Sequence, residues 1–123
     1  HCTQLARALC DATGAACVVV TDGANGAAAA AASEPTRLSS SPLKWPANDL
    51  KAVASLPGPP GVAANSNGAG DAFFAAFVAS SALCDASLDE ALAVANEVAH
   101  ARVFDLPRRP LEEVVQSLRS NNT

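Results

Sequence analysis

The chain has 123 residues and a net charge of −4, so it is long enough for one domain with a modest core. About half of the residues are apolar, which excludes a disordered or fibrous protein, although alanine supplies nearly half of that fraction and buries little area. The acidic balance argues against a nucleic-acid or anionic-membrane partner, and no apolar run approaches the ~20 residues that span a bilayer.

The four cysteines give no metal-binding or disulfide pattern. Cys2, Cys10, Cys17 and Cys84 include no CxxC pair, and neither histidine stands at zinc-ligand spacing from them. The start of the chain has no signal-peptide pattern. We therefore expect reduced, mostly buried thiols, no protein-bound metal and a cytoplasmic location.

The first elements predicted along the chain are a helix and a strand. Residues 3–12 place Leu5 and Leu9 at helical spacing, and Gly14 follows as a C-cap. Residues 15–21 form a short β-branched run, which is typical of a strand buried on both faces.

Turn signals and a run of alanines come next. Residues 22–26 contain Asp-Gly and Asn-Gly, both common in hairpin turns. The six alanines of 27–32 have high helix propensity, but their short length and the flanking turns favour a strand that pairs back on the first.

The middle of the chain, residues 33–64, is rich in loop residues, with turn-forming runs at 39–42 and 56–61. Between these runs, residues 48–53 are expected to form either one helical turn or an edge strand.

Three helices are predicted after Gly68. The first covers 69–83, with Phe73 and Phe77 on one side and a side of small residues that allows close approach to a sheet: Ala72, Ala75, Ala76 and Ala79. The second starts at the capping box of residues 87–90. The third starts with Pro110 at its first position.

The candidate site is the glycine-rich entry to the first of these helices. Gly68, Ala69 and Gly70 leave backbone N–H groups uncovered at a positive helix end, which suits a phosphoryl group. Asp71 follows, where a carboxylate can accept the proton of an attacking hydroxyl. The residues alone equally allow a plain glycine turn with Asp71 as a helix-dipole partner.

The segment Asn-Gly-Ala-Gly-Asp-Ala-Phe at 67–73 resembles the second signature of the ribokinase-like (PfkB) carbohydrate kinases. Residues 18–26 resemble the strand and Thr-x-Gly-x-x-Gly loop with which that family borders its nucleotide. Residues 90–96 resemble its next helix, and Pro107 with the Glu-Glu pair at 112–113 matches its C-terminal end. The likeness covers nearly the whole chain apart from residues 33–64.

The resemblance implies an ATP-dependent phosphotransferase that moves the γ-phosphoryl group to an alcohol hydroxyl of a sugar or nucleoside. Asp71 would act as base, Gly68, Ala69 and Gly70 would form the anion hole, and Mg²⁺ would bridge phosphate oxygens. The nucleotide would be bound by residues from both halves of the chain: Thr21, Gly23, Gly26 and Asn96. Asn65 stands where the family pattern has aspartate, which weakens any inference about a monovalent cation there.

The resemblance also implies a fold class. Residues 1–123 would form the C-terminal, nucleotide-binding part of a ribokinase-like three-layer α/β sandwich, with an incomplete, mostly parallel sheet flanked by helices. The family's substrate-binding half has no counterpart in the chain, so by itself the chain is expected to be inactive.

Two alternatives stay open. The chain could be a truncated, non-catalytic module that binds a nucleotide or a partner, or an α/β domain whose glycine turn matches by chance. Outside the motif, we expect His100 in solvent or at the edge of the core rather than beside a nucleotide. We expect Arg108 and Arg109 to be a solvated pair rather than a phosphate clamp.

Overall fold

The computed structural model describes residues 1–32 and 45–121, the side chains of Ala24 and Asn121 excepted. The loop expected at 39–42 therefore lies outside the described residues. Among the helices of the described ranges, none is both long enough and apolar enough to cross a membrane. Contacts divide the chain into two compact units, His1–Ser55 and Leu56–Thr123.

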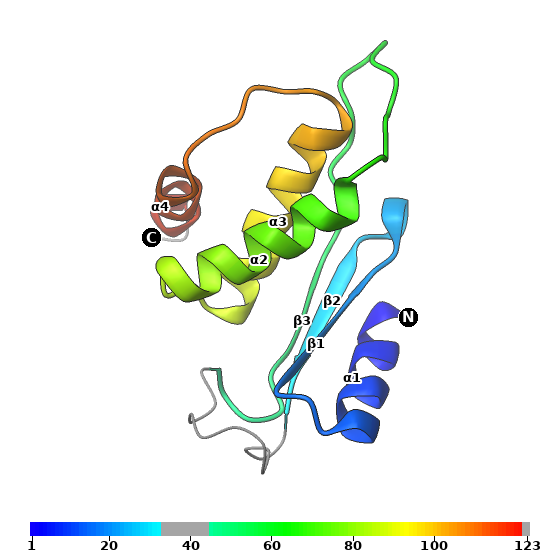
Figure 1. Ribbon diagram of the computed structural model, residues 1–123, viewed down its shortest axis with the longest axis vertical. Helices are drawn as coiled ribbons and strands as arrows, with labels where there is room; N and C mark the ends of the chain where they lie inside the picture. Colours follow the sequence, from blue (N-terminus) through cyan, green and yellow to red (C-terminus); the bar gives the residue numbers. More distant parts are fainter. Residues whose placement is uncertain (33–44, 122–123) are drawn as a thin grey trace. The chain divides into compact units, whose positions relative to one another are not determined.

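The first unit is a small antiparallel sheet with one helix on it (Figure 1). It contains α1 (Cys2–Thr13), β1 (Cys17–Thr21), the 3₁₀ turn η1 (Gly23–Asn25), β2 (Ala27–Ala31) and β3 (Leu50–Val53). The strand order is β1-β2-β3, and both neighbouring pairs are antiparallel. The predicted hairpin is thus confirmed, and the ambiguous segment at 48–53 provides an edge strand.

The sheet direction differs from the one that the family resemblance implied. The described strands pair antiparallel, whereas a mostly parallel sheet was expected. For β1 and β2 the physical reason is their short connection, since a parallel pair needs a crossover of a dozen or more residues. Five residues separate β1 from β2, so only a hairpin can join them.

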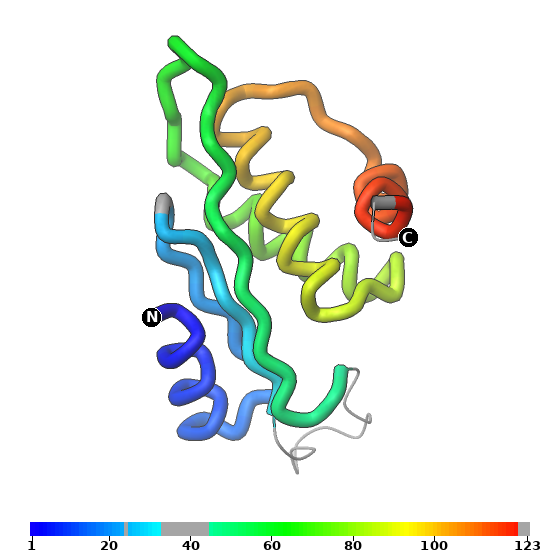
Figure 2. The backbone as a smooth tube through the Cα atoms, turned by 180° about the vertical axis from the view of Figure 1, so that it is seen from behind, coloured from blue at the N-terminus to red at the C-terminus, as the bar shows by residue number. Residues whose placement is uncertain are grey.

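The alanine strand β2 is the centre of the first unit. All five of its residues are buried, and each pairs with β1 in a register that sets Cys17 opposite Ala31 and Thr21 opposite Ala27. β3 follows its other edge, as the tube view also shows (Figure 2). The flanking β1 residues Val18–Val20 are only partly buried, so the predicted burial on both faces was wrong for β1.

Helix α1 packs on one face of this sheet through small side chains. Ala6 and Cys10 are buried in a cluster with Ala28, Ala30 and Ala32. The helix and its left-handed cap at Gly14 (φ 71°) are confirmed. Leu5 and Leu9, on which the helix prediction depended, are instead 45 % and 40 % exposed. The side of α1 that contacts the sheet is the one with Ala6 and Cys10.

The cysteines are free thiols, but only Cys10 is buried, and Cys2, Cys17 and Cys84 are partly exposed. The expectation of mostly buried thiols was therefore wrong for three of them. Burial, with a smaller effect of Cys10, raises the pKa of Cys17 to about 11, so this thiol is protonated near neutral pH and is a poor nucleophile.

The second unit is a helical cluster. It contains α2 (Ala69–Leu83), α3 (Leu88–Val103) and α4 (Leu111–Asn121). Helices α2 and α3 lie side by side, and α4 contacts both (Figure 1). The predicted limits of α2 are confirmed, and α4 starts one residue after Pro110.

Local hydrogen bonds determine where α3 begins. The Ser87 hydroxyl accepts from the Glu90 N–H, and the Glu90 carboxylate accepts from the Ser87 N–H. Glu90 also binds Arg119 of α4 through two hydrogen bonds of 2.7 and 3.1 Å. One side chain therefore caps α3 and ties it to α4.

Candidate functional site

The loop that enters α2 is shaped by its own backbone and by Asn65. The Asn65 side-chain oxygen accepts from the Asn67 N–H at 3.1 Å, and the Asn65 N–H donates to the Val103 carbonyl at 2.9 Å. Gly68 then adopts a left-handed conformation, φ 77° and ψ 3°, as the N-cap residue. Asn65 thus fixes the loop by hydrogen bonding, and glycine suits the turn because it takes a positive φ without strain.

The first turn of α2 offers backbone donors without side-chain caps. The Ala69 N–H donates to the Ser66 carbonyl at 3.1 Å, and the Ala72 N–H to the Gly68 carbonyl at 3.0 Å. Among the described residues, no acceptor meets the N–H groups of Gly70 and Asp71. These two N–H groups lie at the positive end of the helix dipole and are available to an anion.

Asp71 is exposed in the same first turn. Its carboxylate has no hydrogen-bond or ion-pair partner within the described part of the chain. A free, solvated carboxylate beside open N–H groups can accept a proton from a hydroxyl bound there.

Arg102 brings a positive charge to this turn. Its guanidinium lies where a side chain at Gly68 would point: a Cβ there would be 3.5 Å from Nε and 3.6 Å from Nη2. Arg102 is six residues after Asn96 on α3, and the packing of α3 against α2 brings the two together. No sequence motif indicates this pairing.

The second predicted nucleotide segment is the loop between β1 and β2. Thr21 is exposed at the end of β1, and Gly23 starts the 3₁₀ turn with φ 48°. The Asp22 N–H donates to the Gly26 carbonyl at 2.8 Å and closes the loop. Gly26 has φ 92° and ψ −153°, and a Cβ there would lie 2.2 Å from the Val53 carbonyl oxygen, so only glycine fits.

Asn96 is partly buried on α3, one turn before His100. His100 is also partly buried, and its Nε2 lies 2.9 Å from the Pro57 carbonyl oxygen. The centroid of its ring lies 5.1 Å from that of the Phe104 ring. His100 is therefore held at the edge of its unit, as predicted.

The predicted site residues are distributed between the two units. Gly68, Ala69, Gly70 and Asp71 are contiguous in the second unit, which also contains Asn96. The loop with Thr21, Gly23 and Gly26 belongs to the first unit. Their convergence on one nucleotide stays a prediction.

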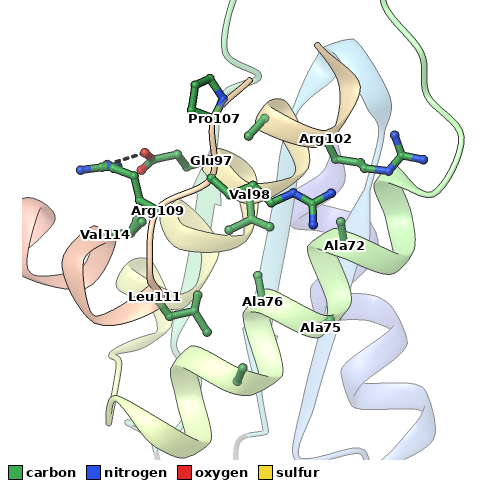
Figure 3. A pocket seen from close by; sticks show the side chains of 13 residues that line it. Ala72, Ala75, Ala76, Glu97, Val98, Arg102, Pro107, Arg109, Leu111 and Val114 are labelled. Atoms are coloured by element: carbon green, nitrogen blue, oxygen red, sulfur yellow. Dashed lines mark hydrogen bonds and ion pairs between the residues drawn. The ribbon is translucent and has the colours of Figure 1, made fainter. Parts of the chain in front are cut away.

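A pocket of about 370 Å³ opens beside this helix entry in the second unit. The four alanines of α2 that were expected to approach a sheet line this pocket, together with α3 and the segment that leads into α4 (Figure 3). Arg102 extends along one side, near Ala72, and the Glu97–Arg109 pair lies on the other side.

Arg108 and Arg109 are both exposed, as expected, but Arg109 is also ion-paired. Arg109 forms a short ion pair with Glu97, donates to the Ser117 hydroxyl at 3.1 Å and lies 3.8 Å from Glu113. The hydrogen bond that Arg109 donates to the Glu97 carboxylate raises the pKa of Arg109 above its ordinary value. Arg108 is exposed, lines the pocket and has no such partner within residues 1–32 and 45–121.

The described residues include no group of three or more side chains from histidine, cysteine, aspartate and glutamate that could hold a metal ion. A magnesium ion here would depend mainly on ligand phosphates, which is its usual mode in phosphoryl-transfer sites.

An α/β chain with an uncapped glycine entry to a helix and an exposed aspartate in its first turn has the local features of a phosphate-binding protein. The family model of the pfkB carbohydrate kinases matches residues 2–106. The chain therefore belongs to the pfkB family of carbohydrate kinases. No curated protein and no solved structure gave a significant match.

Proposed function

We propose that the chain is the nucleotide-binding, C-terminal part of an ATP-dependent kinase that transfers the γ-phosphoryl group to an alcohol hydroxyl of a sugar or nucleoside. The observation that carries this proposal is the first turn of α2, where the free N–H groups of Gly70 and Asp71 stand beside an exposed carboxylate. Membership of the pfkB family gives the reaction class.

The chemistry needs few groups because phosphoryl transfer depends mostly on positioning and charge. The Asp71 carboxylate accepts the proton of the attacking hydroxyl. The N–H groups at the Gly68 turn stabilise negative charge on the transferred group. The Ala69 N–H already donates to Ser66, so it joins only if that hydrogen bond opens.

The site fits ATP through its donors. Open N–H groups at a helix N-terminus and the nearby Arg102 guanidinium match an oxyanion. Mg²⁺ would supply charge neutralisation between phosphates when it accompanies the nucleotide. Thr21, Gly23, Gly26 and Asn96 are proposed to border the rest of the nucleotide. As part of this proposal, the chain contributes to the family's three-layer α/β sandwich. It acts in the cytoplasm on small-molecule ligands.

The test is Asp71→Asn in the full-length protein, with ADP release followed over a panel of sugars and nucleosides. Loss of a positioned base lowers the rate by ~10²–10⁴, while nucleotide affinity changes little. Asp89→Asn is the matched control, since Asp89 is also exposed in the first turn of a helix.

A loss of less than about threefold in turnover for Asp71→Asn would overturn the assignment of the base. Nucleotide binding without turnover in the full-length wild type would instead favour a non-catalytic binding module.

A further inference from the structure

The pocket of the second unit concentrates positive charge on an acidic chain. Its lining includes three arginines, Arg102, Arg108 and Arg109, and one glutamate, Glu97. The whole chain carries a net charge of −4 with eight lysines and arginines. The pocket is therefore positively charged, although the protein as a whole is negatively charged.

Two of the arginines are free to bind a ligand. Arg109 neutralises Glu97 through their ion pair, so the acidic side chain of the pocket is already satisfied. Arg102 and Arg108 have no hydrogen-bond or ion-pair partner among residues 1–32 and 45–121. A guanidinium presents a planar fork of donors that matches a carboxylate or phosphate.

The remaining wall is apolar. It consists of alanines of α2 and α3 with the larger residues Val98, Pro107, Leu111 and Val114. The volume of about 370 Å³ lies in the range of small-molecule pockets, ~300–1,000 Å³. Apolar walls with a few convergent polar groups are typical of such sites.

We propose that this pocket binds a small organic anion with an apolar body, a carboxylate or a monophosphate ester, through Arg102 and Arg108. The apolar body packs on the alanine side of α2, and the acid group receives hydrogen bonds from the two guanidinium groups. The pocket shares Arg102 with the proposed phosphate site at the Gly68 turn, but its lining does not include Asp71, and its test does not require kinase activity.

The experiment uses calorimetry on the chain with phenyl phosphate and phenylacetate as probes and benzyl alcohol and inorganic phosphate as references. Both organic anions should bind more tightly than either reference, because only they use the apolar wall and the arginines together. The better of the two probes distinguishes a phosphate ester from a carboxylate.

Two kinds of variant separate charge from shape. Arg102→Ala and Arg108→Ala should each weaken the organic anion about tenfold, as expected for loss of a charge-assisted hydrogen bond. Lys51→Ala is the control, because Lys51 lies on β3, outside the pocket. Ala75→Leu fills the pocket from an exposed helix position and should weaken phenyl phosphate but not inorganic phosphate.

Circular dichroism checks that each variant is folded. Equal affinities for inorganic phosphate and phenyl phosphate would overturn the proposal, since the apolar wall would then contribute nothing. A loss of less than about threefold in the Arg102→Ala/Arg108→Ala double variant would overturn it as well. If one variant fails to fold, Ala75→Leu and the comparison of probes still decide.

Discussion

Replacing Glu90 by glutamine should expose how much of the second unit depends on the link between α3 and α4. Glu90 accepts from Arg119 at 2.7 and 3.1 Å and from the Ser87 N–H at 2.9 Å. Glutamine at this position can keep the capping-box hydrogen bond, because its amide oxygen is also an acceptor. The substitution therefore removes the charge opposite Arg119 and leaves the cap in place.

The magnitude follows from the carboxyl group's pKa. The hydrogen bond from Arg119, supported by that from Ser87, lowers the pKa of Glu90 from 4.5 to about 2. At about 1.4 kcal/mol per pKa unit, this shift sets an upper limit of ~3 kcal/mol on the contribution of the Glu90 charge to the free energy of unfolding. The Glu90 side chain is 17 % exposed but that of Arg119 is 41 % exposed, so solvent screening reduces the expected loss to about 1–2 kcal/mol.

The pH dependence gives the prediction a second check. Because folding lowers the pKa of Glu90, its contribution is complete above pH 4.5 and is lost as the pH falls towards 2. Urea unfolding followed by circular dichroism should give a free-energy difference between wild type and Glu90→Gln that is constant near neutral pH. The difference should shrink between pH 4.5 and 2.

The control is Glu112→Gln, which removes an exposed carboxylate from the first turn of α4. A difference for Glu90→Gln no larger than that control, or one that does not change with pH, would refute the reasoning.

Three further substitutions test local geometry. Gly26→Ala should destabilise the first unit by at least about 2–3 kcal/mol, because its Cβ would lie 2.2 Å from the Val53 carbonyl oxygen in addition to the backbone strain. Gly14→Ala, with φ 71° and nothing within 4 Å, should cost only ~1–2 kcal/mol in the same urea assay, and equal losses would contradict the clash. Ser87→Ala should lower the free energy of unfolding by ~0.5–2 kcal/mol, because it removes the acceptor for the Glu90 N–H. An unchanged urea midpoint would contradict this prediction.

The sequence alone determined features that depend on hydrogen bonds between near neighbours. The start of α3 at its capping box, the end of α1 at Gly14 and the glycine entry to α2 were all predictable. Each is formed by groups within a few residues of one another, so the local pattern contains the necessary information. The motif at 67–73 pointed to the pfkB family in the same way, and the family match confirmed it.

Propensity alone could not decide the conformation of the alanine run, and turn signals were needed to favour a strand. Alanine is the best helix former, yet β2 is extended because β1 and β3 satisfy its backbone groups on both edges. Which side of α1 is buried also depended on this partner, since Ala6 and Cys10 are buried in a cluster with the sheet alanines, whereas the larger Leu5 and Leu9 stay 45 % and 40 % exposed.

Only the tertiary structure placed the charged side chains. Arg102 reaches the Gly68 turn, Arg109 meets Glu97, and Arg119 meets Glu90, and the partners in these pairs are 12 to 34 residues apart in the chain. Such pairings depend on how α2, α3 and α4 pack, and neither composition nor periodicity contains that information. The sequence could therefore predict the glycine turn that enters α2, whereas the arginine beside it and the pocket next to it follow from helix packing.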